Sequence, residues 1–249
     1  PVRDDIQLAR VLNTAHEIRR TSPEIRHDST ALSRVLTRTY AAGLIQSLQP
    51  PEQGEASDEK TGETTHFSVV DRDGNAIAVT ASINAYFGAV ALSPRLGFLY
   101  NSYMDDFVFD NTDHVDAIRP RAAAYSSMSP TMVQRAGSTQ LVIGSPGSAR
   151  IISTVAQLTH FWISAQPSLE DLLMRPRVHA QSGRVYLEDP SSDARLFRAA
   201  GFTVSFPTYD LMQRERNAYF GGVHAIARSP GGWTGAADPR RDGIVMYPD

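Results

Sequence analysis

The residues best suited to chemistry in this chain are two consecutive threonines, Thr64 and Thr65, at the start of a predicted hairpin. A threonine hydroxyl is a weak nucleophile until a base takes its proton. Cleavage before Thr64 would free an α-amino group, with a pKa of about 8, as a base on the same residue. The residues just upstream, 50–63, are acidic, rich in Pro and Gly and without apolar periodicity, which predicts a flexible, exposed linker. This pattern fits a self-cleaving precursor, and it also fits an ordinary linker before an edge strand.

Other common catalytic signatures are absent from the sequence. The seven histidines show no metal-ligand spacing such as His-Glu-x-x-His. The chain has neither a Gly-x-x-x-x-Gly-Lys-Ser/Thr phosphate loop nor a Gly-x-Ser-x-Gly nucleophile elbow. The lack of cysteine excludes disulfides, thiolate zinc sites and a cysteine nucleophile. The threonine hydroxyl is the candidate nucleophile that remains.

Composition narrows the class of protein. With 249 residues, 41% of them apolar, the chain can form the packed core of one large domain or two small ones. A net charge of −3 without a basic stripe argues against binding to nucleic acid or anionic membranes. The apolar stretches are shorter than a membrane span, and residues 1–5 do not resemble a signal peptide. Because the sequence does not begin with Met, we expect the natural protein to start upstream.

The elements that must position the threonine follow from the spacing of apolar residues. Helices are predicted over residues 4–20 and from 28 to about 47, where Pro50 and Pro51 follow. The hairpin pairs residues 64–71 with 76–84 across an Asp-Gly turn. Short strands or extended segments are expected at 86–92 and 96–100, and long loops, which are often functional, at 101–107 and 119–130.

The second half of the chain begins with a strand, glycine turn and helix unit. Strands are expected at 131–134 and 140–144, followed by a turn over 145–148 and a helix carrying Ile151, Val155, Leu158 and Trp162. A capping box at Ser168 and Asp171 predicts a short helix ending at Met174. Further strands are expected at 184–188, 202–206, 223–228 and 233–237, with a helix over 190–200. Residues 238–241 are expected to end the ordered structure.

Five blocks of sequence, in this order, resemble the γ-glutamyltransferase (γ-glutamyltranspeptidase) family. They are Thr64–Asp71 with Gly74 and Asn75, Asn101 with Met104–Phe107, Arg119-Pro120 with Ser126–Pro130, Gly144–Ser148, and Pro176-Arg177 with His179 and Gln181. The ending Gly235–Arg241 is similar to that of the family as well. The resemblance implies an α+β N-terminal-nucleophile hydrolase with a four-layer αββα sandwich, of which this chain would carry only part. Residues 1–63 would be the tail of the large subunit, two helices and an acidic linker, and 64–249 the small-subunit catalytic domain.

The resemblance also implies a role for each site residue. Thr64 would first attack the Glu63–Thr64 bond in autocleavage and then the γ-glutamyl amide of the substrate, supported by Ser82. The backbone N–H groups of Gly147 and Ser148 would form the oxyanion hole, where each donor contributes about 3–4 kcal/mol. The residues expected to bind the substrate's α-amino and α-carboxylate groups are Asn84, Tyr103, Asp106, Ser126 and Ser127.

Three of these positions depart from the family pattern, which usually has Gly at Ser148, Thr at Ser82, and Glu or Gln at Tyr103. Each group also has a plain structural interpretation. Gly147-Ser148 fits an ordinary strand-to-helix turn with a capping serine. The pair Asp105-Asp106 fits a solvated loop, and Ser126-Ser127 fits a cap or turn.

The function implied by the resemblance is γ-glutamyl transfer or hydrolysis through a γ-glutamyl ester on Thr64, without metal or cofactor. Glutathione is the expected donor, and water or an amine the acceptor. Alternatives are a cephalosporin or glutaryl acylase, a poly-γ-glutamate hydrolase and a catalytically silent homologue. Asp106 and the paired serines favour an amino-acid-like acyl group.

The resemblance places the partner and the location as well. The missing large-subunit segment is expected as heterodimer partner, because the sheet of this chain alone would expose an open apolar face. Residues 1–249 by themselves are therefore not expected to be a complete catalyst. A periplasmic or secreted location is expected, although the cytoplasm also fits.

Overall fold

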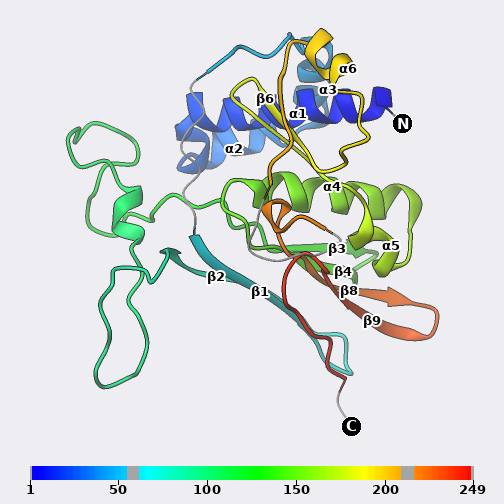
Figure 1. Ribbon diagram of the computed structural model, residues 1–249. Helices are drawn as coiled ribbons and strands as arrows, with labels where there is room; N and C mark the ends of the chain where they lie inside the picture. The colour runs from blue at the N-terminus through cyan, green and yellow to red at the C-terminus, as the bar shows by residue number, and fades with distance from the viewer. Residues whose placement is uncertain (1, 55–61, 209–215, 248–249) are drawn as a thin grey trace. The chain divides into compact units, whose positions relative to one another are not determined.

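The computed structural model describes residues 2–54, 62–208 and 216–247, which form two compact units of mixed helices and strands (Figure 1). Unit 1 comprises residues 1–58, 103–126 and 178–206. Unit 2 comprises residues 59–102, 127–177 and 207–249. Both units take residues from either side of position 63, so a division into 1–63 and 64–249 does not follow the compact units. The assignment of these two stretches to two subunits remains a prediction.

Unit 1 consists of helices packed on a small mixed sheet. Its helical elements are α1 (Val2–Thr21), η1 (Pro23–Arg26), α2 (Ser29–Val35), α3 (Arg38–Gln46), η2 (Tyr103–Asp106) and α6 (Ala194–Ala199). Strands β5 (Val178–Gln181), β6 (Arg184–Leu187) and β7 (Thr203–Ser205) form the sheet, with β5 antiparallel and β7 parallel to β6. The predicted apolar stripe of α1 packs on β5, and its Ala9 and Leu12 are buried against Val178, Ala180 and Val185.

The prediction of one helix over residues 28–47 is wrong, because two helices occupy this stretch. Asp28 caps α2 as expected, accepting a hydrogen bond of 2.7 Å from the Thr30 N–H. Thr37 then begins a new helix, since its hydroxyl accepts from the Tyr40 N–H at 3.1 Å. A threonine that satisfies a free N–H of the following turn favours a cap over a helix interior. The predicted 190–200 helix is also shorter than expected, because Asp193 caps it.

The start of the predicted flexible linker is docked on the sheet of unit 1. The Gln53 amide group donates to the carbonyl oxygens of Gly183 (3.2 Å) and Gly201 (2.9 Å) and accepts from the Thr203 hydroxyl (2.9 Å). The Gly54 N–H donates to the Ser182 carbonyl at 3.2 Å. Flexibility is therefore the wrong prediction for residues 53 and 54, and residues 55–61 lie outside the described part of the chain.

Unit 2 is built in three layers. Strands β3 (Thr131–Arg135), β4 (Ser138–Gly144), β8 (His224–Ser229) and β9 (Gly232–Ala237) form an antiparallel sheet in the order β3-β4-β8-β9. Helices α4 (Arg150–Ala165) and α5 (Leu169–Met174) pack on this sheet, and η3 (Ala218–Phe220) precedes β8. The hairpin of β1 (Gly62–Val70) and β2 (Ala76–Ala85) contacts β4 and β8. These strands and helices confirm the predicted elements.

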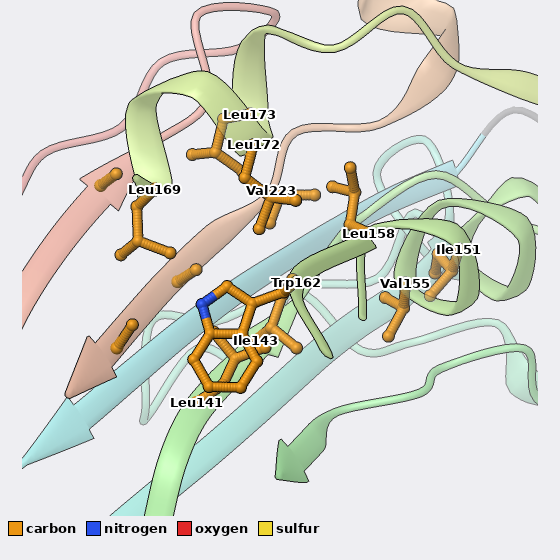
Figure 2. Packing of buried hydrophobic residues seen from close by; sticks show 13 residues of the cluster. Leu141, Ile143, Ile151, Val155, Leu158, Trp162, Leu169, Leu172, Leu173 and Val223 are labelled. Carbon is orange, nitrogen blue, oxygen red and sulfur yellow. The ribbon is translucent and has the colours of Figure 1, made fainter. Parts of the chain in front are cut away.

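The core of unit 2 lies between the four-stranded sheet and its helices, as Figure 2 shows. Leu141 and Ile143 of β4 point toward Val155, Leu158 and Trp162 of α4. Side chains alternate along a strand, and Gly144 on the other face of β4 lies against His66 of the hairpin. The core members are Leu141, Ile143, Ile151, Val155, Leu158, Trp162, Leu169, Leu172, Leu173, Val223, Ala225, Ala227 and Ala236. Burial of this apolar surface fixes α4, and with it the turn that precedes α4.

The hairpin β1–β2 has two unlike faces. The inner face carries His66, which is buried, and its cross-strand neighbour Thr80. The outer face carries the cross-strand neighbours Val69 and Ile77, together with Phe67, all of them exposed. This is the open apolar sheet face that the sequence analysis led us to expect.

Two other expectations need correction. Residues 86–92 and 96–100 form no regular strand, and residues 86–89 form a turn instead. The expectation of extended segments holds in part, because Leu92 and Leu99 form an antiparallel bridge and the Tyr100 N–H donates to the Ala91 carbonyl at 2.9 Å. Residues 238–241 do not end the ordered structure, because Asp238 and Arg240 are almost completely buried and the described chain continues to residue 247.

Across the described residues, no helix has the length and apolarity needed to cross a membrane.

Candidate active site

Thr64 lies at a β-bulge in the hairpin. Glu63 pairs with Asn84 and Thr64 pairs with Ser82, so Ile83 is an extra residue on β2 at this point. The Thr64 hydroxyl donates a hydrogen bond of 3.0 Å to the Ser82 Oγ, and the Ser82 hydroxyl donates one of 2.8 Å to the Glu63 carbonyl oxygen. Bulges re-aim side chains next to active sites. This bulge brings the predicted nucleophile and its predicted support together at the predicted scissile bond.

The Ser82 hydroxyl is the centre of this arrangement. Its oxygen accepts from the Thr64 hydroxyl and from the Asn84 backbone N–H, the latter at 3.0 Å, while its proton points to the Glu63 carbonyl. A hydrogen bond to a carbonyl oxygen stabilises the negative charge that develops there during nucleophilic attack. A serine hydroxyl can make these hydrogen bonds as a threonine hydroxyl would. Serine at position 82, where the resembled family usually has threonine, is therefore compatible with the expected supporting role.

Asn84, which is predicted to bind the substrate's α-amino group, also stabilises the end of β2. Its φ of 69° lies in the left-handed region, which asparagine tolerates better than most residues. Its side-chain amide donates to the Ser102 carbonyl at 3.3 Å, and the Ser102 hydroxyl accepts from the Ala85 N–H at 3.2 Å. These bonds hold the end of β2 against the chain that leads to Tyr103.

The turn after β4 has the geometry of a backbone anion site. Gly147 and Ser148 both have positive φ, 134° and 55°, and α4 begins two residues later. In the described part of the chain, neither of their N–H groups donates a hydrogen bond. The interpretation of Ser148 as a helix cap is wrong, because Ala149 occupies the cap position and no side chain caps α4. Two N–H groups at a helix start suit an oxyanion.

The left-handed backbone at Ser148 explains why the resembled family usually has glycine there, and it gives a stability prediction. Ser148→Gly should raise the free energy of unfolding by about 0.5–1 kcal/mol, because glycine adopts positive φ without a Cβ clash. The same change at Ser164, an exposed helical residue of α4, should instead lower it by about 1 kcal/mol. Urea unfolding of both variants checks this, and a Ser148→Gly protein no more stable than the parent would contradict it.

A buried network of ion pairs is connected to the turn that carries Gly147 and Ser148. Asp238 accepts from the guanidinium groups of Arg177 and Arg240, and all three side chains are buried. Arg177 also donates to the Phe220 carbonyl at 2.8 Å. The residues after Phe220 reach the turn directly, since the Gly222 N–H donates to the Ser145 hydroxyl oxygen at 3.2 Å. The sequence analysis missed this network, because no local pattern marks ion pairs between residues that are far apart in the chain.

The remaining predicted residues divide between the two units. Tyr103 and Asp106 lie on η2 of unit 1, where Asp106 is half-buried. Ser126 also belongs to unit 1, and its carbonyl accepts from the Arg19 guanidinium at 2.7 Å. Arg19 in turn lies 3.9 Å from the centre of the Tyr125 ring. Arg19 was not predicted, because a basic residue near a helix end carries no distinguishing signal. Ser127 belongs to unit 2, with its carbonyl accepting from the Ser129 hydroxyl.

His66 is a buried titratable residue two positions after Thr64 on β1. Burial, and then the nearby charge of His224, lower the pKa of His66 to about 4. The ring is therefore neutral at physiological pH. The sequence marked His66 only as a neighbour of Thr64 in the family motif.

The layered helices and sheets, with the candidate nucleophile on a hairpin and a candidate backbone anion site at a helix start, fit the α+β fold of N-terminal-nucleophile hydrolases. The chain belongs to the gamma-glutamyltranspeptidase family, whose sequence model matches residues 7–247. It is 34% identical over 166 residues to a glutathione hydrolase proenzyme of Pseudomonas sp. strain A14, covering 60% of this chain and 29% of that protein.

Two further relatives bear on fold and chemistry. The chain is 34% identical over 223 residues to the acylase ACY 1 proenzyme of Pseudomonas sp. strain V22, covering 86% of this chain and 38% of that protein. The solved γ-glutamyltranspeptidase from Pseudomonas nitroreducens, complexed with L-DON, matches with a TM-score of 0.64 and 30% identity. That match covers 74% of this chain and 100% of the solved chain. The chain thus spans about a third of the length of these two curated relatives.

Proposed function

We propose that the protein hydrolyses or transfers γ-glutamyl groups through an ester on Thr64, after cleaving its own chain between Glu63 and Thr64. The observation that carries the proposal is the hydrogen-bonded line from the Thr64 hydroxyl through Ser82 to the Glu63 carbonyl. Membership of the family supports the reaction class, and the relative named glutathione hydrolase supports glutathione or a related γ-glutamyl amide as donor.

Self-cleavage begins with attack of the Thr64 Oγ on the Glu63 carbonyl carbon. The Ser82 hydroxyl stabilises the developing oxyanion, since it already donates to that carbonyl oxygen. The peptide C–N bond breaks, the hydroxyl proton passes to the departing nitrogen, and Glu63 becomes esterified to the Thr64 oxygen. Water then hydrolyses this ester, leaving a carboxylate at Glu63 and a free amino group at Thr64.

The mature enzyme repeats the attack on its substrate. The Thr64 α-amino group takes the hydroxyl proton as the oxygen attacks the γ-carbonyl carbon of the donor. The N–H groups of Gly147 and Ser148 stabilise the oxyanion, and the proton passes to the leaving amine as the C–N bond breaks. Water attacking the resulting ester gives glutamate, whereas an amino acid or peptide amine gives a new γ-glutamyl amide.

Recognition of the donor rests on groups complementary to a zwitterion. Asp106 and the amide oxygen of Asn84 would bind the α-ammonium group, and Tyr103 belongs to the same helical element as Asp106, η2. Ser126 and Ser127 would bind the α-carboxylate. The upstream large-subunit segment would complete the enzyme as a heterodimer partner, and the periplasmic or secreted location stays a prediction.

The second candidate function is that of an acylase, favoured by the similarity to acylase ACY 1. A glutaryl group differs from a γ-glutamyl group in lacking the α-amino group, so Asp106 would have no cation to bind. Comparing wild-type hydrolysis of γ-glutamyl-p-nitroanilide with that of glutaryl-p-nitroanilide separates the two functions. Faster hydrolysis of the glutaryl compound would contradict the proposed γ-glutamyl function and favour the acylase function.

Asp106→Ala should raise the KM for γ-glutamyl-p-nitroanilide by about 30-fold or more, because the substrate ammonium loses its charged partner. The matched control is Asp105→Ala, since Asp105 is the exposed neighbour on the same element. This control should keep the KM within about threefold. Steady-state kinetics of both variants measure the effect. Unchanged kinetics in the Asp106 variant would remove this residue from the site.

A further inference from the structure

His66 connects β1, the strand of Thr64, with the neighbouring strands of unit 2 through hydrogen bonds. Its ring is 2% exposed, with Nδ1 at 2.8 Å from the Thr80 hydroxyl and Nε2 at 3.0 Å from the Ser68 hydroxyl. The His66 carbonyl accepts a hydrogen bond of 2.6 Å from the His224 ring. Hydroxyl groups can donate or accept, so a neutral ring is satisfied in either tautomer. These bonds fix both the place and the rotation of the ring.

The ring rests on Gly144, the last residue of β4. A Cβ at Gly144 would lie 2.2 Å from the His66 Cε1 and 2.3 Å from its Nδ1, so any larger residue would displace the ring. The backbone of Gly144 does not itself require glycine, because its φ lies outside the positive region. Glycine is needed here for the close approach of the imidazole.

The two residues joined by this contact lie next to the two halves of the proposed catalytic site. His66 is two residues beyond Thr64 on β1, and Gly144 leads into the turn that presents the Gly147 and Ser148 N–H groups. Strand spacing alone does not define this separation, because β1 and β4 belong to different sheets. A rigid ring held by two hydrogen bonds provides a spacer of fixed thickness between them.

We propose that His66, seated on Gly144, is a positioning residue that sets the distance between the Thr64 nucleophile and the backbone oxyanion site. This inference rests on the proposed function and deepens it. The burial of a polar ring where an aliphatic side chain could pack fits this role, since a polar group is costly to bury unless its hydrogen bonds are useful. The groups that face the ring from β2, β4 and β8 are Thr80, Gly144 and His224.

The test is a double-mutant cycle in the full-length protein, using γ-glutamyl-p-nitroanilide. Gly144→Ala should lower kcat by about 100-fold, the cost of a misplacement near 1 Å, with KM within about threefold. His66→Ala should also lower kcat. In the double variant, the alanine methyl group occupies space vacated by the ring, so kcat should recover at least about tenfold over Gly144→Ala.

Matched controls are Gly43→Ala, at a glycine with open space around its Cβ position, and His160→Ala, at an exposed histidine of α4. Both should keep wild-type kinetics. A Gly144→Ala enzyme with wild-type kcat would overturn the inference, and so would a double variant whose loss is the product of the two single losses. A rise in KM equal to the fall in kcat would indicate general damage and also overturn it.

The wild-type measurement separates this inference from the proposed function. A wild type without γ-glutamyl activity would overturn the proposed function and the positioning role together. The contact itself has an independent readout, the coupling in unfolding midpoint between positions 66 and 144. If the two substitutions are non-additive in their effect on stability but additive in their effect on kcat, the contact serves packing only, and the positioning role is overturned.

Discussion

Thr64→Ala is expected to leave the chain uncut and to lower γ-glutamyl hydrolysis by about 10⁴-fold or more, because it removes the nucleophile of both reactions. Wild-type protein should yield a new N-terminus at Thr64 and a fragment covering residues 64–249. The alanine variant should keep a single intact mass. Intact-mass analysis under denaturing conditions distinguishes the two directly.

The control for this experiment is built into the sequence. Thr65 is the next residue of the same strand, and its side chain is exposed on the other face of the hairpin. Thr65→Ala should therefore cleave and turn over like the wild type. Cleavage at Glu63–Thr64 in the Thr64 variant would show that another group performs the processing.

Asp238→Ala should produce the largest loss of stability, about 3–5 kcal/mol, because it leaves two buried guanidinium groups without their carboxylate. The matched control is Arg195→Ala, which removes the exposed partner of the Asp193 ion pair and leaves the Asp193 cap of α6 in place. This control should change the free energy of unfolding far less than Asp238→Ala, because an exposed ion pair is screened by water. Chemical unfolding of the two variants measures the difference. Equal effects would show that the buried network contributes no more than a surface pair.

The same network predicts a direction with pH. Burial alone would raise the pKa of Asp238, but the charges of Arg177 and Arg240 outweigh it and hold this pKa below its usual 3.8. The Asp238 carboxyl therefore binds a proton more readily in the unfolded chain than in the folded one. The stability that its charge contributes is fully present above the unfolded pKa, about pH 4. It is lost as the pH falls through the lower, folded pKa. The wild type should show this acid destabilisation, and Asp238→Ala should lack it.

The elements that position the candidate nucleophile Thr64 were predictable because their signals are local. Alternating residues and an Asp-Gly turn marked the hairpin, and the spacing from Ile151 to Trp162 marked α4. The helix break at Thr37 was missed because the same threonine fits a helix surface or a cap. Burial of Asp238 could not be foreseen, since its partner Arg177 is distant in sequence. In the candidate site, the contact of Ser82 with Thr64 agrees with what the family resemblance implied, whereas the contact of His66 with Gly144 was missed.

The core of unit 1 is shared by residues on both sides of the proposed scissile bond. Ala9 and Leu12 come from the upstream side, and Val178, Val185 and Phe197 from the downstream side. Separating the two pieces after cleavage would expose this core to water, which opposes dissociation. A cut molecule should therefore migrate as one particle in a native sizing experiment. Maturation would change the connectivity of the chain while leaving its cooperative unit of folding intact.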